Sequence, residues 1–390
     1  MVRADEGFGS KGAGLDPETH PEVRIVTTLP DLIRTEIRES GPLTFARYMD
    51  LALYHPELGY YATGIQRTGW RGHFLTAPEL GPAFGRLWAT GFERVWEACG
   101  SPESFSVVEV GPGEGGFAKA VLDNASPPFA AALEYRLVER VPAVRKRQQS
   151  VLAGHGNVAW SAELGDAGPL EAGCLFANEV IDNLPVHVVE GRDGRIVELY
   201  VSERGAELEL VTGPPSPEVG KAAPAVAEGA RSEVGLAGAR LVASGAELLV
   251  KGAVVIVDYG DDAAGLAARP GGTLLSYSES GTDDLVLLDP GSRDITSHVN
   301  WTTLRAALEN SGATVVGPFE QRVILARLGA GELDAELRHR SQTGAGVAVV
   351  RALSERSALG VLTDPGALGS FGVLAGLRAI APPDFLGPVE

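Results

Sequence analysis

The spacing of apolar residues changes character near residue 105. Before that point, apolar positions recur at helical spacing, which predicts helices at roughly 29–40, 44–54 and 82–99. After it, short β-branched runs alternate with helical stretches, the pattern of a parallel sheet whose strands are joined by helices. The predicted core strands cover residues 106–110, 135–139, 157–160, 174–177, 253–258, 314–316 and 322–326. The pattern therefore predicts an α/β fold.

The same pattern divides the chain into parts. Residues 1–25 are Gly-rich and polar without periodicity, so we expect a flexible tail there. Residues 26–104 form the predicted helical N-terminal cover, and residues 105–330 form the α/β core. An insertion at about 186–235 carries three strand-like pieces and a Pro/Ala/Gly-rich stretch, which indicates a small subdomain beside the site. Helical spacing returns later and predicts a C-terminal helical segment over 331–390.

Composition narrows the classes of function. The 390 residues are 44% hydrophobic and 22% charged, which fits a packed soluble protein. A formal net charge of −18 argues against broad electrostatic binding of nucleic acid or of an anionic membrane. The chain has no leader-like start and no apolar run of about 20 residues, so we expect a cytoplasmic protein without a membrane partner. Two cysteines are too few for a disulfide scaffold or a zinc cluster, and we expect no metal.

A glycine-rich segment follows the first core strand and opens a helix. It reads Gly-Pro-Gly-Glu-Gly-Gly over residues 111–116, in the context where loop amides and a helix N-terminus receive a ligand. As G-x-G-x-x-G it matches a dinucleotide fingerprint. Counted from Glu109 it also matches E-x-G-x-G-x-G, which is typical of class I S-adenosylmethionine methyltransferases. A third interpretation is a tight strand-to-helix turn that binds nothing.

Three details favour the S-adenosylmethionine interpretation. An acid at Glu109 suits a ligand that carries an ammonium group, Glu114 would repel pyrophosphate, and Pro112 removes one amide donor. Glu139 ends the next strand, 28 residues after Gly111, where both cofactor classes place an acid that accepts from ribose hydroxyls. The alternative for Glu139 is a solvated surface acid. The cofactor residues predicted in this region are Glu109, Gly111, Pro112, Gly113, Gly115 and Glu139.

Polar residues follow the fourth core strand, at the edge of the sheet where ligands bind in such folds. If residues 178–184 form a short helical turn, Glu179 and Asp182 share one face and can meet a cation together. With Asn178, they could hold a guanidinium or an amine, neutralise it and aim its nitrogen at a sulfonium methyl group. The alternative is that Asn178 caps a helix whose first turn carries surface acids. His187 could act as a general base, or it could be an ordinary packed strand histidine.

Beyond these motifs, the chain resembles the MidA-like methyltransferases, a family whose mitochondrial member is a complex I assembly factor. The resemblance covers roughly residues 30–380 and includes a helix with a Tyr-Tyr loop and a block similar to G-D-F-x-T-A-P-E. The similar blocks are residues 43–50, 53–61, 72–80, 109–115, 138–148, 177–187, 294–301 and 362–365. The chain departs from the family at His73, Glu114 and Gly116-Phe117, which could alter contacts at the cofactor or an approaching substrate.

The resemblance implies a class I methyltransferase fold: a Rossmann-like, mostly parallel seven-stranded sheet with a helical N-terminal cover. It also implies S-adenosyl-L-methionine as cofactor and a possible homodimer. Within the block at 72–80, Thr76, Pro78 and Glu79 would belong to a cofactor lid, or else to a buried loop that fastens the cover to the sheet. Trp160 ends the third predicted strand, near where methyltransferases seat adenine, although a tryptophan there is more often part of the core.

The resulting hypothesis is a methyltransferase with Asn178, Glu179, Asp182 and His187 as catalytic candidates and Asn178 also near the cofactor. The first guess for its reaction is N-methylation of a guanidinium or amine, with a protein arginine as acceptor, as in the mitochondrial relative. A biosynthetic N- or O-methyltransferase that acts on a small molecule or peptide is the alternative within the enzyme class. From another class, the protein could be a non-catalytic assembly factor that binds the cofactor. An NAD-dependent oxidoreductase is the remaining competitor.

Overall fold

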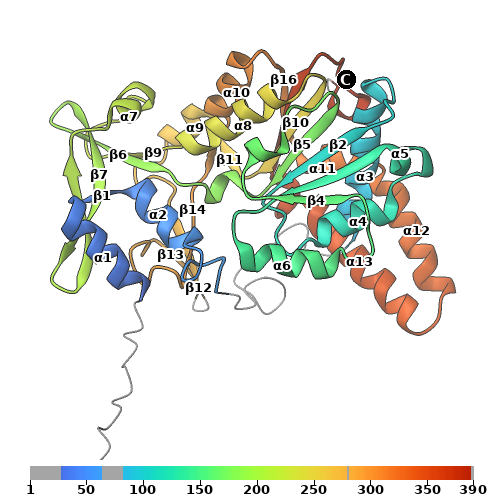
Figure 1. Ribbon diagram of the computed structural model, residues 1–390, viewed down its shortest axis with the longest axis horizontal. Helices are drawn as coiled ribbons and strands as arrows, with labels where there is room; N and C mark the ends of the chain where they lie inside the picture. The colour runs from blue at the N-terminus through green and yellow to red at the C-terminus, as the bar shows by residue number, and fades with distance from the viewer. Residues whose placement is uncertain (1–27, 64–81, 279–280, 388–390) are drawn as a thin grey trace, which may run out of the picture.

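The computed structural model describes residues 28–63, 82–278 and 281–387 (Figure 1). Its main body is a seven-stranded sheet in the order β16-β17-β10-β5-β2-β3-β4. The five strands from β10 to β4 run parallel, and β17 lies antiparallel between β16 and β10. The strands are β2 (Phe105–Val110), β3 (Leu133–Val138), β4 (Val158–Ser161), β5 (Gly173–Asn178), β10 (Gly252–Asp258), β16 (Thr314–Glu320) and β17 (Gly372–Arg378).

Helices cover both faces of this sheet, so its central strands are buried on both sides and read as continuous apolar runs. One face packs against α3, α4 and the C-terminal helices through an aromatic cluster that includes Phe84, Trp88 and Phe176. The other face packs against α8 and α10. The helices are α3 (Ala83–Ala98), α4 (Gly116–Asn124), α5 (Pro127–Ala132), α6 (Pro142–Val151), α8 (Leu236–Leu248), α10 (Trp301–Asn310), α11 (Gln321–Arg327), α12 (Ala330–Thr343) and α13 (Val347–Thr363).

A second sheet stands beside the first, at the left of Figure 1. Its order is β1-β7-β6-β9, with β8 paired to β7, and its elements are β1 (Leu43–Thr44), β6 (His187–Arg192), β7 (Arg195–Arg204), β8 (Glu207–Gly213) and β9 (Arg231–Val234). The helices α1 (Leu29–Ser40) and α2 (Phe45–Tyr54) bury their apolar sides in one core with Val188, Leu199 and Val201 of this sheet and with Val186, which directly precedes β6. The first two predicted helices therefore pack against the inserted strands, whereas α3 packs against the main sheet.

A small sheet of β12 (Leu275–Ser278), β13 (Gly281–Asp283) and β14 (Asp294–Thr296) shares this second core, through Ile295 of β14 and Val286 of the loop that follows β13. The remaining short elements are α7 (Pro217–Ala222), α9 (Ala263–Ala267), β11 (Gly260–Asp261) and β15 (Val299–Asn300), with 3-10 turns η2 (Leu164–Ala167), η3 (Ile181–Asn183), η4 (Leu368–Ser370) and η5 (Asp384–Leu386). The predicted tail at 1–25 lies outside the described residues.

Two predictions near the C-terminal end are wrong. Residues 322–326 form part of α11 rather than a strand, because an apolar run of this length suits either element and Ile324 and Leu325 are fully buried as helix residues. The seventh strand is instead β17, which lies inside the segment 331–390 that was expected to be helical. Its side chains are buried because it inserts between two strands that precede it in the sequence.

None of the helices in the described part of the chain combines the length and the apolarity needed to cross a bilayer. Among the same residues, no group of three or more His, Cys, Asp or Glu side chains is arranged to hold a metal ion. Cys99 and Cys174 are buried free thiols.

Candidate active site

The glycine loop joins β2 to α4 at the carboxyl edge of the parallel strands. Gly111 and Gly113 have φ angles of +64° and +50°, in the left-handed region that favours glycine. A Cβ atom on Gly111 would lie 2.7 Å from Cγ2 of Val180, which belongs to the segment after β5. The loop that opens α4 and the segment that follows β5 are therefore in direct contact.

Glu114, the charged member of the loop, pairs with Arg147 of α6. The guanidinium donates to both carboxylate oxygens, with Nε at 2.8 Å from Oε2 and Nη2 at 2.9 Å from Oε1. Arg147 thus offsets the negative charge that Glu114 brings to the loop.

Glu139 follows β3 and faces the same edge of the sheet. Its Oε1 accepts a hydrogen bond from the backbone N–H of Val141 at 2.8 Å. Burial raises the pKa of Glu139 to about 7, although the Val141 amide, the Gln148 side chain, Arg145 and Arg147 all act to lower it. The side chain is half-buried, so it is neither a solvated surface acid nor sealed in the core.

Glu109 lies deeper, with 4% of its surface exposed. The hydroxyl of Tyr135 donates to its Oε2 at 2.8 Å, and burial raises the pKa of Glu109 to about 8. Because side chains alternate along a strand, Glu109 shares the face of Phe105 and Val107, which packs against α3 and α4. Contact between Glu109 and a ligand ammonium stays a prediction.

The segment after β5 turns sharply at Glu179, and of the possible helical turn over 178–184 only residues 181–183 are helical, as the 3-10 turn η3. Glu179 has a φ angle of +52°, an unusual conformation for a residue with a Cβ atom, and its N–H donates to Val257 at 2.9 Å. Asn178 Nδ2 donates to Glu179 Oε1 at 3.1 Å. Asn178 is not a helix cap, because its Oδ1 accepts from no backbone N–H of the following turn. Its Oδ1 is buried and has no hydrogen-bond partner among the described residues, which leaves an acceptor for a ligand.

Asp182, in η3, lies against a second acid that the sequence did not single out. Asp258 ends β10, and its Oδ2 accepts from the backbone N–H groups of Ile181 at 3.0 Å and Asp182 at 3.3 Å. Its Oδ1 accepts from the N–H of Tyr259 at 2.8 Å. The signal for Asp258 was available: an acid directly after a fully apolar strand, at the edge where Glu139 and Asn178 also lie.

These two acids are buried together, with 3% of Asp182 and 0% of Asp258 exposed. Burial raises the pKa of Asp182 to about 7, and burial followed by the charge of Asp182 raises the pKa of Asp258 well above its ordinary value. Within the described residues, no arginine, lysine or histidine forms an ion pair with either acid. Two adjacent buried acids without a counter-ion favour a cationic ligand.

Side chains at the end of α2 close this site from the second sheet. The hydroxyl of Tyr54 donates to the backbone oxygen of Asn183 at 3.2 Å, and the guanidinium of Arg140 lies 4.7 Å from the centre of the Tyr54 ring. Arg140 also pairs with Asp50 at 2.8 Å. Tyr54 thus connects Arg140, which follows Glu139, to the η3 turn that contains Asp182.

The remaining predicted residues lie elsewhere. His187 Nδ1 is 2.7 Å from Oε1 of Glu198, which is fully buried. His187 alternates with Val186 and Val188, which face α1 and α2, so it lies on the opposite face of the second sheet, away from Asp182. Thr76, Pro78 and Glu79 lie outside the described residues.

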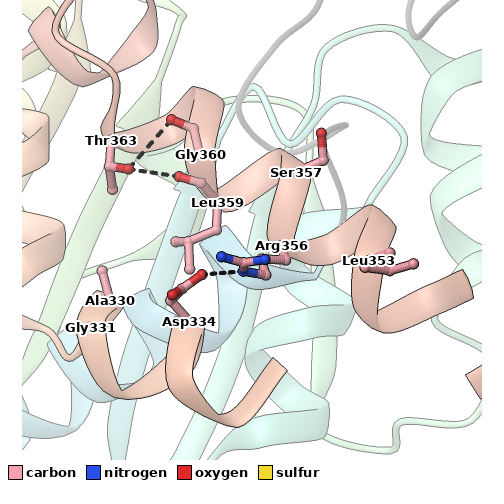
Figure 2. Close-up of a pocket in the computed structure, with 9 residues that line it drawn as sticks. All are labelled: Ala330, Gly331, Asp334, Leu353, Arg356, Ser357, Leu359, Gly360 and Thr363. Carbon is pink, nitrogen blue, oxygen red and sulfur yellow. Dashed lines mark hydrogen bonds and ion pairs between the residues drawn. The ribbon is translucent and has the colours of Figure 1, made fainter. Parts of the chain in front are cut away.

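The surface formed by the described residues carries hollows at two places of interest. One of about 540 Å³ lies between α12 and α13, with the Asp334–Arg356 ion pair at 2.6 Å on its wall (Figure 2). It is lined only by residues 330–363 and contains none of the candidate residues. The other, of about 310 Å³, lies along β3 and β4 and includes Trp160 and Ser161 at the carboxyl end of β4, on the side of the site formed by Glu139.

The chain is similar to known proteins over most of its length. A family model described as "Putative S-adenosyl-L-methionine-dependent methyltransferase" matches residues 87–319. The mitochondrial protein arginine methyltransferase NDUFAF7 homolog of Drosophila melanogaster is 28% identical over 384 residues, which cover 88% of this chain and 83% of that protein. The human protein arginine methyltransferase NDUFAF7 is 27% identical over 372 residues, which cover 84% and 79%.

Among solved structures, a "likely methyl transferase" from Burkholderia thailandensis bound to S-adenosyl-homocysteine matches with a TM-score of 0.80 and 28% identity. The match covers 91% of this chain and 92% of that one. A second structure from the same organism matches with a TM-score of 0.79 and 27% identity, covering 92% and 93%.

Proposed function

This chain belongs to a family of S-adenosyl-L-methionine-dependent methyltransferases, and from that membership we propose that it methylates a cationic nitrogen acceptor, a guanidinium or an amine, with a protein arginine as the first candidate. The predicted class I fold and the S-adenosyl-L-methionine cofactor are confirmed. The acceptor is the part proposed here.

The described residues fit the cofactor. The glycine loop at the start of α4, the carboxylate of Glu139 and the free buried Oδ1 of Asn178 all meet at one edge of the sheet. Bound there, S-adenosyl-L-methionine supplies a methyl group on a positively charged sulfur. The protein would hold it with the loop amides and with Glu139, which accepts from neutral hydroxyls.

The observation that carries the acceptor proposal is the buried pair Asp182 and Asp258. Val180 packs on Gly111 of the cofactor loop, and Asp182 follows Val180 by two residues. The acid pair is therefore close to the cofactor loop, because the N–H of Asp182 donates to Asp258. Carboxylates of this kind can accept N–H bonds from a guanidinium or ammonium group and hold its nitrogen in line for transfer. With a pKa of about 7, Asp182 can also take the proton that the nitrogen loses.

Relatives support arginine among the cationic acceptors, because the curated relatives above are named protein arginine methyltransferases. The acids alone do not choose between guanidinium and ammonium, since both groups donate to carboxylates. A neutral hydroxyl acceptor would leave two buried acids without a cation, which disfavours O-methylation.

The test is transfer of a labelled methyl group to a panel of peptides and small molecules that carry arginine, lysine, other amines or hydroxyls. We expect transfer to a nitrogen, and we expect Asp182→Asn to lower its rate about 100-fold while the affinity for S-adenosyl-homocysteine changes less than about threefold. Asp334→Asn, in the distant pair with Arg356, is the matched control and should transfer like the wild type.

Transfer to hydroxyls alone, or full activity of the Asp182 variant, would contradict the acceptor proposal. A wild type that binds S-adenosyl-homocysteine and methylates no member of the panel would favour the non-catalytic assembly factor.

A further inference from the structure

Gln148 is a polar residue on the buried side of α6. Its side chain is 0% exposed and follows Val144, which is also buried, by one helical turn. Its neighbour Gln149 is exposed. A buried amide is costly unless its donors and acceptor are bonded, so the partners of Gln148 indicate why it is there.

Those partners belong to two different segments of the cofactor site. Nε2 of Gln148 donates to the backbone oxygen of Gly113 at 2.7 Å, and Nε1 of Trp160 donates to its Oε1 at 3.2 Å. A Cβ atom on Gly115 would lie 3.5 Å from the side chain of Gln148. The side-chain amide of Gln148 therefore links the glycine loop to the end of β4 through one hydrogen bond to each.

The same amide acts on a third segment, the end of β3. Together with the N–H of Val141, the Gln148 side chain lowers the pKa of Glu139 against the effect of burial. The other charged or titratable groups that act on Glu139 are Arg145 and Arg147 of α6, with Glu114 of the loop paired to Arg147, and Tyr54 of α2. Arg140, the residue after Glu139, pairs with Asp50.

We propose that Gln148 is a positioning residue for the cofactor, whose single amide holds the glycine loop, the end of β4 and the carboxylate of Glu139 in register for binding the adenosyl group. The proposal rests on the proposed function through its cofactor and is independent of the acceptor.

The proposal predicts the direction in which the affinity for the cofactor changes with pH. An ionised Glu139 would accept from the ribose hydroxyls of a bound ligand, so the affinity for an adenosyl ligand should rise with pH through the pKa of about 7. Replacing Gln148 by an apolar residue removes a donor to the ionised form. The pKa of Glu139 then rises further, and the midpoint of the affinity profile moves to higher pH.

The test is calorimetric titration of the full-length protein with S-adenosyl-homocysteine between about pH 5.5 and pH 9. For Gln148→Leu we expect a loss of affinity of about 10- to 30-fold at pH 7, a smaller loss of about threefold at pH 9, and a midpoint at higher pH. Gln149→Leu, one position along the same helix, should follow the wild-type profile. Glu139→Gln should bind weakly and without a midpoint near pH 7.

A uniform loss of affinity in Gln148→Leu at every pH, with the midpoint unmoved, would overturn the proposal and leave Gln148 a merely structural residue. So would a wild-type affinity that does not change with pH. Should Gln148→Leu fail to fold in a thermal melt, Gln148→Met decides, because its flexible uncharged side chain fills similar space without either donor, and its midpoint must then rise. The proposed acceptor can fail while these profiles hold, since the acceptor takes no part in them.

Discussion

Two strands of the sheet end at acids with similar pKa values and different surroundings, Glu139 half-buried and Asp182 buried. Glu139, after β3, is faced by donors: the Val141 amide, Gln148 and the arginines of α6. Asp182, after β5, lies against another acid, Asp258, while the Tyr259 side chain and the nearby backbone N–H groups act to lower its pKa. Both pKa values are raised to about 7, chiefly by burial.

The difference teaches that a raised pKa does not by itself say what an acid binds. Glu139 already has donors and arginines that favour its ionised form. A ligand that offers neutral hydroxyls is therefore enough to satisfy its remaining acceptor sites. Asp182 and Asp258 have no cationic partner among the described residues, so a cation is the ligand that stabilises them most. The surroundings divide the site into a cofactor end and an acceptor end.

The largest expected effect comes from changing the acceptor end alone. In Asp258→Asn one side of the group becomes an N–H donor, so at least one of the backbone N–H groups of Ile181, Asp182 and Tyr259 loses its acceptor. We expect methyl transfer to fall about 100-fold and the affinity for S-adenosyl-homocysteine to change less than about threefold. Rates and calorimetric affinities measured on the same preparation check this.

The control for that variant is Asp261→Asn, a partly exposed acid shortly after the same strand, which should behave like the wild type. If Asp258→Asn lost affinity for S-adenosyl-homocysteine as strongly as it lost transfer, the two ends of the site would not be separable.

A smaller effect that joins the two ends is expected from Gly111→Ala. The added methyl group would meet Val180 at 2.7 Å and would sit on a residue with φ of +64°. Affinity for S-adenosyl-homocysteine should fall about 30-fold, and transfer should fall at least as much, because the shift passes through Val180 to the acceptor end. Calorimetry and transfer rates are again the measurements.

Gly113→Ala distinguishes the cost of a left-handed backbone from the cost of a steric clash with Val180. The φ angle of Gly113 is also left-handed, at +50°, but an added Cβ there would have no atom within 4 Å outside its chain neighbours. It should lose about 1 kcal/mol of unfolding free energy, and Gly111→Ala about 2–4 kcal/mol. Equal losses in a denaturant titration would mean that the contact with Val180 is unimportant.

The smallest effect on methyl transfer is expected from a change at His187, which tests whether this residue belongs to the acceptor end of the site. Because it faces Glu198 on the far side of the second sheet, His187→Gln should leave the transfer rate within about threefold of the wild type. Unfolding free energy should fall by about 1 kcal/mol, since the buried Glu198 keeps a poorer partner. A 100-fold slower enzyme with an altered pH profile would show that His187 is the base after all.

Much of the core could be predicted because its strands are apolar on both faces and end at polar residues. The glycine loop, Glu139 and the residues after β5 are local in sequence and follow directly from such strands. Residues 322–326 were assigned to the wrong element because a short apolar run fits a helix or a strand, and only the neighbours decide. β17 was missed because the strands that it pairs with, β10 and β16, lie far earlier in the chain.

The site could be predicted only in part. Asp258 had a readable signal at the end of an apolar strand, but its pairing with Asp182 depends on β10 lying beside β5. Gln148 is marked in the sequence only by its place on the apolar stripe of α6, and its neighbour Gln149 has the same side chain and none of its contacts. The corner at Glu179, with φ of +52°, has no sequence signature because the residue is not glycine.

The place of β17 has a consequence for how the protein is made. Synthesis runs from the N-terminal end, so β10 and β16 leave the ribosome well before the strand that separates them. Until residues 372–378 emerge, β10 presents an unpaired edge of the kind that recruits other strands. A chain truncated before residue 372 would therefore keep the glycine loop and both acids but expose the unpaired edge of β10. We expect such a chain to aggregate rather than to act as a slower enzyme.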